Sequence, residues 1–345
     1  GGGDIGGLTY ALDGIGVNAA NGSYAFGTTG FSGAFNFTTS GTPNYFIAAS
    51  ATGTGDGSST ANRASIATAI GAAAGLGTVN FVLINDGSAI DTSGLTFALA
   101  DNQTIDTFGN GRTFTSVGLN VAANIPGTNL PAGTTAITDP TGNGAATLTN
   151  TSGAVSTIEV ANGNSIRNIT LGSTLGTALS GTGIAGLTIE GVTIGSGTDT
   201  PVNGIELNNT TGAVTLTNVD ITNTTGTGLS LNGAGGTVTG NNVDITGSNA
   251  LSVNGGDAVV SFNATSSITN TSGTAVSITN RIGGSFTHFG SISSNGGTAS
   301  GITISGATAA SNVTFGGQVS LGTTSALGGS GVFINNNGQA SDIAF

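Results

Sequence analysis

The phrases "GTGLSLNG" (226–233) and "SNALSVNG" (248–255) repeat one pattern 22 residues apart: apolar residues at alternate positions, then Asn-Gly. Related phrases, "VNGIELNN" (202–209) and "SGTAVSIT" (272–279), lie on either side. Alternation of apolar residues is typical of a strand with one buried face, and Asn-Gly is typical of a tight turn. A strand and turn that recur at a nearly constant interval indicate a stacked structural unit.

The first apolar position of this phrase recurs at intervals of 24, 22, 25, 26 and 30 residues, at Ile205, Leu229, Leu251, Val276, Ile302 and Val332. A second series of strand-like segments runs through Val192–Ile194, Val219–Ile221, Val243–Ile245 and Ser266–Ile268, and a weaker third series through Leu187–Ile189 and Val214–Leu216. One such strand buries nothing alone, but strands stacked ~4.8 Å apart enclose an apolar column. We therefore predict an all-β fold, a parallel β-helix (solenoid) with three short strands per coil of about 22–30 residues.

Amide side chains recur in the predicted turns, three residues after the first apolar position, at Asn208, Asn232, Asn254 and Asn335. Thr279 and Ser305 take this place in the intervening coils. Stacked Asn side chains form hydrogen-bonded ladders, and Asn tolerates left-handed backbone angles. We interpret these residues as a structural ladder.

The composition excludes several classes of protein. A net charge of −12, with Arg63, Arg112, Arg167 and Arg281 as the four basic residues, disfavours nucleic acid and anionic lipid. No apolar run approaches the ~20 residues that span a bilayer, so we expect no membrane insertion. A hydrophobic fraction of 37% favours a folded chain. The absence of Cys fits an extracellular protein, and the start without Met indicates a processed product or a segment of a longer chain.

Residues 146–345 resemble the right-handed parallel β-helix of the pectate-lyase-like superfamily, as in repeat regions of large bacterial surface adhesins and autotransporter passengers. The stretches "YFIAASATGTGDGSSTANRASIATAI" (45–70), "VNFVLINDG" (79–87) and "LADNQTIDTFGNGRTF" (99–114) are similar to the entry coils of those proteins. The resemblance implies a right-handed coil and no shared catalytic chemistry.

The local composition of the sequence divides the chain into three parts. Residues 1–45 carry clustered aromatics and are interpreted as an N-terminal β-rich capping or entry segment. Residues 46–145 are expected to form entry coils with one short helix at about 60–75, and residues 146–345 the regular coils.

The best candidates for chemistry are Asp220 and Asp244, at equivalent places in two consecutive "VDIT" segments. If the coils stack as predicted, both carboxylates point outward one strand spacing apart, where they could remain solvated, share a cation such as calcium, or act as a catalytic pair. No Arg, Lys or His falls in the same register, and the motifs of the galacturonase-like and lyase-like members are missing. We therefore expect no enzyme and no cofactor, with calcium as the one candidate.

Other chemical signals are weaker. His288 in "SFTHFG" is expected to be a surface or partly packed residue, and Arg167 and Arg281 are each expected to pair with a carboxylate. Threonine rows such as Thr188, Thr215 and Thr237 resemble ice-binding faces, but Asp, Glu and Asn residues interrupt them.

The sequence favours a non-catalytic extracellular structural or adhesive module: a surface protein, an adhesin stalk or a self-assembling filament subunit. The alternative is a polysaccharide-binding or polysaccharide-degrading β-helix protein centred on Asp220 and Asp244. Expected partners are other copies in head-to-tail contact or neighbouring segments of a longer chain, and surface glycans, with no nucleic acid.

Overall fold

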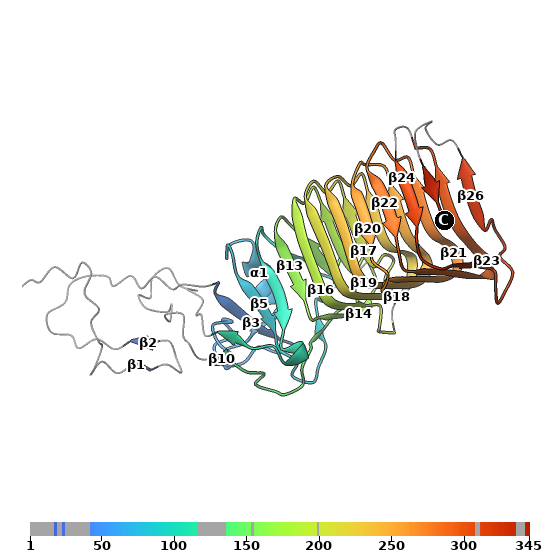
Figure 1. The fold of residues 1–345 in the computed structure, drawn as a ribbon. Helices are drawn as coiled ribbons and strands as arrows, with labels where there is room; N and C mark the ends of the chain where they lie inside the picture. The colour runs from blue at the N-terminus through green and yellow to red at the C-terminus, as the bar shows by residue number, and fades with distance from the viewer. Residues whose placement is uncertain are drawn as a thin grey trace, which may run out of the picture.

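The computed structural model describes residues 42–115, 136–152, 155–198, 200–307, 311–335 and 342–345, and the backbone of a short antiparallel pair, β1 (Val17–Asn18) and β2 (Ser23–Tyr24). It confirms a nearly all-β parallel solenoid, whose coils stack side by side along one axis (Figure 1). The predicted capping segment 1–45 otherwise lies outside the described residues up to residue 41.

Each coil contributes to three parallel sheets, which we number in the order in which the chain passes through them. The short strands of the first sheet are β3 (Asn44–Ala48), β5 (Asn80–Leu83), β8 (Thr104–Thr107), β13 (Asn164–Arg167), β20 (Val259–Phe262), β22 (Ser285–His288), β24 (Asn312–Phe315) and β27 (Ile343–Ala344). Those of the second sheet are β6 (Ile90–Asp91), β11 (Thr147–Asn150), β14 (Thr170–Thr174) and β25 (Val319–Leu321). Those of the third sheet are β7 (Phe97–Ala98), β12 (Ile158–Val160), β15 (Leu179–Thr182), β17 (Ile205–Asn208) and β26 (Val332–Asn335).

Longer strands bend around the corners and take part in two or three sheets. They are β16 (Gly186–Ile194), β18 (Ala213–Asn232), β19 (Thr237–Asn254), β21 (Ser267–Thr279) and β23 (Ser291–Ser305). Such continuity means that few backbone groups at the corners leave the ladder of parallel hydrogen bonds.

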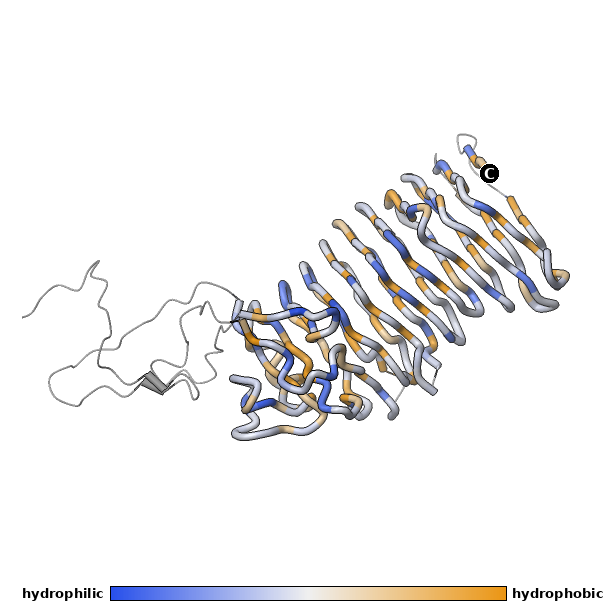
Figure 2. The backbone as a smooth tube through the Cα atoms, turned by 60° about the horizontal axis from the view of Figure 1, so that its bottom comes forward, coloured by the Kyte–Doolittle hydropathy of each residue, from blue (hydrophilic) through white to orange (hydrophobic). Residues whose placement is uncertain are grey.

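The predicted apolar series is confirmed as a file of residues in parallel register within the third sheet. Nine residues follow one another in it: Phe97, Ile158, Leu179, Ile205, Leu229, Leu251, Val276, Ile302 and Val332. All but Val332 are buried, and they join the inward residues of the other two sheets in one core. Apolar and polar residues alternate along the strands of the regular coils (Figure 2), because successive side chains of a strand point to opposite faces.

The recurring Asn-Gly has a backbone cause. The residue after the ladder position has a positive φ in six consecutive coils, at Gly183, Asn209, Gly233, Gly255, Asn280 and Gly306. Gly and Asn are the residues that enter this left-handed region at least cost. Space restricts the position further, since a Cβ on Gly233 would lie 2.3 Å from Oδ1 of Asn209 in the preceding coil. The phrase "LNG" therefore encodes a corner of the coil.

The predicted helix is present and covers the N-terminal end of the column (Figure 1). It is shorter than expected, α1 (Ile66–Ala73), because the preceding residues form β4 (Ala64–Ser65), which pairs with β3. The Ser65 hydroxyl accepts a hydrogen bond from the backbone of Thr68 (3.2 Å) and begins the helix. Ile66 and two alanines of the helix are buried against the column.

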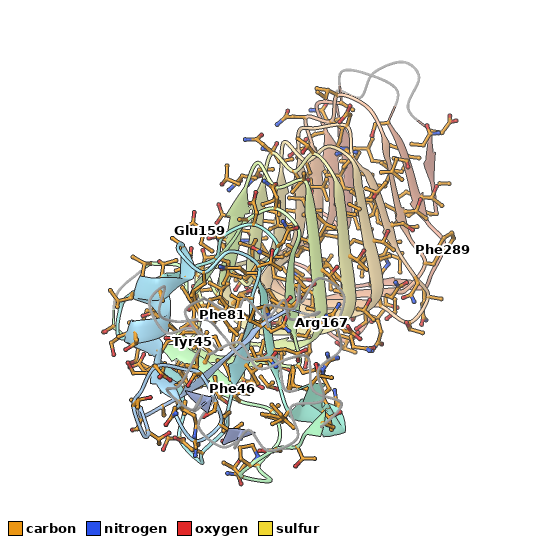
Figure 3. All side chains as sticks on the ribbon, turned by 90° about the vertical axis from the view of Figure 1, so that its left-hand side faces the viewer. Tyr45, Phe46, Phe81, Glu159, Arg167 and Phe289 are labelled. Carbon is orange, nitrogen blue, oxygen red and sulfur yellow. The ribbon has the colours of Figure 1, made fainter. Side chains whose placement is uncertain are left out.

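A second, smaller core lies on the outer face of the first sheet near this end. It contains Phe46, Ala48, Val82, Ile84, Phe108 and Phe114. The antiparallel pair β9 (Phe114–Thr115) and β10 (Ala136–Ile137) and the short 3₁₀ turn η1 (Gly109–Gly111) belong to the segments that cover it. Figure 3 views this end, with Phe46, Tyr45 and Phe81 labelled. Because both faces of the strands are covered here, "NYFIA" in β3 is buried throughout instead of alternating.

Candidate functional site

Asp220 and Asp244 are direct neighbours in the register of the second sheet, between Thr193 and Ser267. Both lie between inward-pointing residues of their strands, so their carboxyl groups are on the outer face. The Ser267 hydroxyl donates a hydrogen bond of 2.5 Å to Oδ1 of Asp244. The strand register therefore places the two carboxylates one coil apart on the outer face, as the sequence predicted.

The surroundings of Asp220 disfavour its ionised form. Partial burial raises the pKa of Asp220, and the negative charge of Asp244 raises it further. The described residues contain no group of three or more His, Cys, Asp or Glu side chains arranged to bind a metal ion. A cation at this place would therefore take two carboxylates and complete its shell with hydroxyl groups and water, a weaker donor set than calcium usually receives.

The amide ladder lies on the outer face of the third sheet. Asn208, Asn232 and Asn254 follow one another in register. Asn232 Nδ2 donates to Asn208 Oδ1 at 3.0 Å, and the Thr279 hydroxyl donates to Asn254 Oδ1 at 3.0 Å. Asn335 follows Ser305 in the last coil and is exposed. These bonds link consecutive coils through side chains in addition to the backbone.

A cluster of four charged residues was not predicted from the sequence. Arg112 Nη2 lies 2.7 Å from Asp106 Oδ2, and Arg167 Nε lies 3.5 Å from Glu190 Oε2. The prediction that Arg167 pairs with a carboxylate is confirmed. Burial raises the pKa of Asp106, against the opposing effects of a hydrogen bond from Asn168 and the charge of Arg112. Asp106 is only 2% exposed, and its ion pair attaches the turn that follows β8 to the coils.

The sequence positions of these charged residues reveal the cluster only once the strand register is known. Arg167 pairs in register with Glu190, and Ile166 with Ile105, so Asp106, Arg167 and Glu190 occupy consecutive coils. The interval from residue 106 to residue 167 is longer than one repeat of the regular coils, and this hides the register that relates the two residues.

The expectation for His288 is wrong. Its side chain is 1% exposed and continues the inward file that contains Phe262 and Phe315. The rings of Phe262 and His288 have centroids 5.6 Å apart. Burial lowers the pKa of His288 to about 4, although Nδ1 lies 3.2 Å from the carbonyl oxygen of Gly290. The imidazole is therefore a neutral part of the core, and Phe289, the next residue, points outward and is 49% exposed (Figure 3).

Two further expectations are corrected by the register. Thr215 pairs with Thr239, whereas Thr237 pairs with Ala213, so the threonine file of the first sheet is Thr188–Thr215–Thr239. Arg281 forms no ion pair within 4 Å of a described carboxylate and donates to backbone carbonyl groups instead.

Comparison with known proteins does not assign the chain to a family. No family model, no curated protein and no solved structure matches the chain. In the part of the chain that the structure describes, no helix is long and apolar enough to cross a membrane.

Proposed function

We propose that this chain is a non-catalytic, extracellular structural or adhesive module, built as a right-handed β-helix of the pectate-lyase-like type. It would serve as part of a surface protein, an adhesin stalk or a filament. The observation that carries the proposal is the uninterrupted register from β7 to β26, through about nine turns of the solenoid.

The mechanical part of the proposal rests on the stacking of the coils. At ~4.8 Å per coil, nine coils extend roughly 40 Å along the axis. Each coil bonds to the next through backbone groups on three sheets, and the third sheet adds the bonds between Asn208 and Asn232 and between Asn254 and Thr279. This arrangement favours a stiff spacer.

The adhesive part rests on the outer faces, where hydroxyl and amide groups predominate. In the third sheet, Ser252, Ser277 and Thr303 form one outward file of partly exposed hydroxyl groups. A surface with 6% charged residues and many neutral donors and acceptors suits neutral polar partners such as surface glycans. A charge of −12 and the absence of Cys and Lys support an extracellular location away from polyanions.

The assembly part rests on the last coil. Val332 and Ile334 occupy inward positions, yet they are 43% and 47% exposed, because no described residue covers them. A further β-coil would bury them and pair the edge of β26 that has no partner among the described residues. The opposite end of the column is covered by α1, so a coil supplied by a longer chain suits this surface better than the N-terminal end of a second copy.

Negative-stain electron microscopy, with and without calcium, tests the assembly. Long filaments of uniform width would support a fibre of stacked subunits, and separate short rods would support a stalk or passenger segment. Globular particles without an elongated axis would contradict the proposal.

The second candidate is a polysaccharide-binding or polysaccharide-degrading β-helix, which the raised pKa of Asp220 beside Asp244 favours. A carboxyl group whose pKa is raised by burial and by a neighbouring negative charge is a candidate general acid or cation ligand. A glycan array followed by turnover assays would identify a substrate. The double variant Asp220→Asn/Asp244→Asn should then lose binding or turnover, and full activity in that variant would remove this site from consideration.

A further inference from the structure

Arg281 is a buried arginine at a corner that the other described coils fill with uncharged residues. It follows the left-handed residue Asn280, and the equivalent places after Gly183, Asn209, Gly233, Gly255 and Gly306 hold Ile184, Thr210, Ala234, Gly256 and Ala307. Its side chain is only 1% exposed, which makes it the largest of the fully buried side chains. An arginine in this place is unusual, because a buried guanidinium remains charged and needs compensation.

The compensation supplied by the described residues is incomplete. Nη1 donates to the carbonyl oxygen of Gly255 at 3.0 Å, and Nη2 donates to that of Ala258. The buried Nε has no hydrogen-bond partner among them. The carboxylate that acts electrostatically on the guanidinium is that of Asp257. Its side chain is exposed and forms no ion pair with Arg281. Two carbonyl dipoles therefore face a full positive charge.

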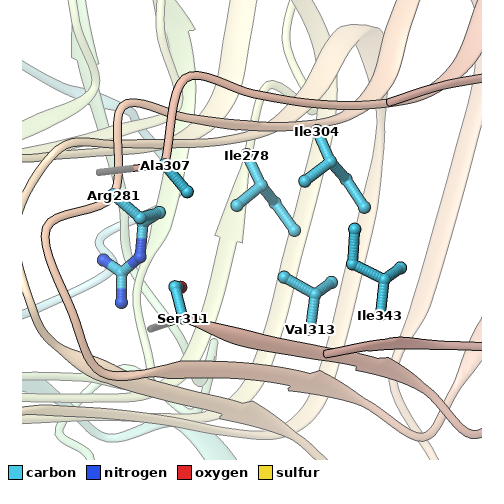
Figure 4. Close-up of a pocket in the computed structure, with 7 residues that line it drawn as sticks. All are labelled: Ile278, Arg281, Ile304, Ala307, Ser311, Val313 and Ile343. Carbon is cyan, nitrogen blue, oxygen red and sulfur yellow. The ribbon is translucent and has the colours of Figure 1, made fainter. Parts of the chain in front are cut away.

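A small cavity adjoins the guanidinium. It is lined by Ile278, Arg281, Ile304, Ala307, Ser311, Val313 and Ile343. Arg281, Ser311 and Ala307 lie at one end of it, and the larger aliphatic side chains of Ile278, Ile304, Val313 and Ile343 lie toward the other (Figure 4). The space accommodates about one water-sized particle.

We propose that this cavity binds a small monovalent anion of halide type, held by Arg281 Nε with Ser311 at its side. A monovalent anion supplies the negative charge that the guanidinium lacks, and it fits a cavity whose remaining walls are aliphatic. A water molecule could satisfy Nε but would leave the charge uncompensated. The cavity would thus act as a structural anion site between the last coils of the solenoid.

Crystals of the unaltered protein grown in sodium bromide test the site directly. The expected result is one anomalous peak within hydrogen-bonding distance of Arg281 Nε. Continuous density without an anomalous signal would identify a water molecule, and an empty cavity would show that neither binds. Either result would overturn the proposal.

Thermal unfolding at constant ionic strength tests the same site in solution. Replacing a bulky organic anion by chloride should raise the unfolding midpoint, by about 2 °C at ten times the dissociation constant. Iodide should raise it less than chloride, because iodide is too large for the cavity, whereas unspecific surface adsorption would favour iodide. Equal midpoints in all these salts would contradict the site.

Two variants separate anion binding from packing. Arg281→Met keeps an unbranched side chain without the charge and should abolish the chloride effect, whatever its own stability. Asp257→Asn removes an exposed negative charge that opposes the anion, and it should lower the dissociation constant of chloride about two-fold to five-fold. If chloride stabilised both variants as much as the unaltered protein, the chloride would bind elsewhere in the molecule and the proposal would be wrong.

Discussion

The two ends of the apolar column are built from the same repeat but are finished differently. At the N-terminal end, α1 lies across the column, and its Ile66 and Ala73 are buried. At the other end, Val332 and Ile334 occupy positions that are buried in every earlier coil, yet they are exposed by more than two fifths. The difference teaches that burial in a solenoid depends on the next coil and cannot be assigned to a residue by its place in the repeat.

The largest effect should come from a matched pair of substitutions within one inward file. Ile278 is 1% exposed, and Ile334 lies two coils further along the same file and is 47% exposed. Ile278→Ala should lower the free energy of unfolding by about 3–4 kcal/mol, because it leaves a cavity. Ile334→Ala should cost less than about 1 kcal/mol, because much of its surface already meets water. Urea unfolding of both variants measures this contrast, and equal losses would show that a cover exists over the last coil.

The covered end should depend on Gln103, a fully buried residue. Its Nε2 donates to the carbonyl oxygens of Ala73 (2.6 Å) and Gly77 (2.9 Å), where the helix ends. Gln103→Leu leaves these carbonyls without that donor and should destabilise the protein by about 2–3 kcal/mol. Hydrogen exchange should accelerate first in residues 66–77. Unchanged protection there would mean that packing alone holds α1.

Within the column, His288 should make stability depend on pH. Its pKa is about 4 in the folded protein and about 6.5 when unfolded, so the unfolded chain takes up the proton first. Stability is then full above pH 6.5 and falls as the pH decreases toward 4, by roughly 2 kcal/mol between pH 7 and pH 5.

The variant His288→Phe is the control for this effect. Phenylalanine already stands before and after His288 in its file, so the substitution continues an aromatic row. The difference between the two proteins in the free energy of unfolding should be constant above pH 7. Below pH 6.5 it should change steadily, because only the unaltered protein loses stability there. Parallel stability curves for the two proteins would show that His288 is not the titrating group.

The smallest effect concerns the corners of the regular coils. Gly233→Ala should cost about 1–2 kcal/mol, because φ is +60° and the new Cβ would approach Asn209 Oδ1. Asn209→Gly, at the same corner one coil earlier, should change stability by less than about 0.5 kcal/mol. Thermal unfolding of the two variants measures the difference. A Gly233→Ala protein as stable as the parent would show that the corner relaxes.

The repeat was readable from the sequence because both of its determinants are local. Alternation of apolar residues sets which side chains point inward, and a left-handed corner residue must be Gly or Asn, as Asn209 and Gly233 show. Once the period was known, the neighbourhood of Asp220 and Asp244 followed, since equivalent residues of consecutive coils lie side by side.

Only the tertiary structure decided what depends on register across irregular segments or on space inside the coil. The pairing of Thr215 with Thr239, the burial of His288 in an aromatic file, and the cluster of Asp106 with Arg112 required the alignment of distant strands. The cavity beside Arg281 required knowledge of which side chains the neighbouring coils bring to one corner. Local sequence determines that a coil forms, whereas the coils above and below determine what each of its residues touches.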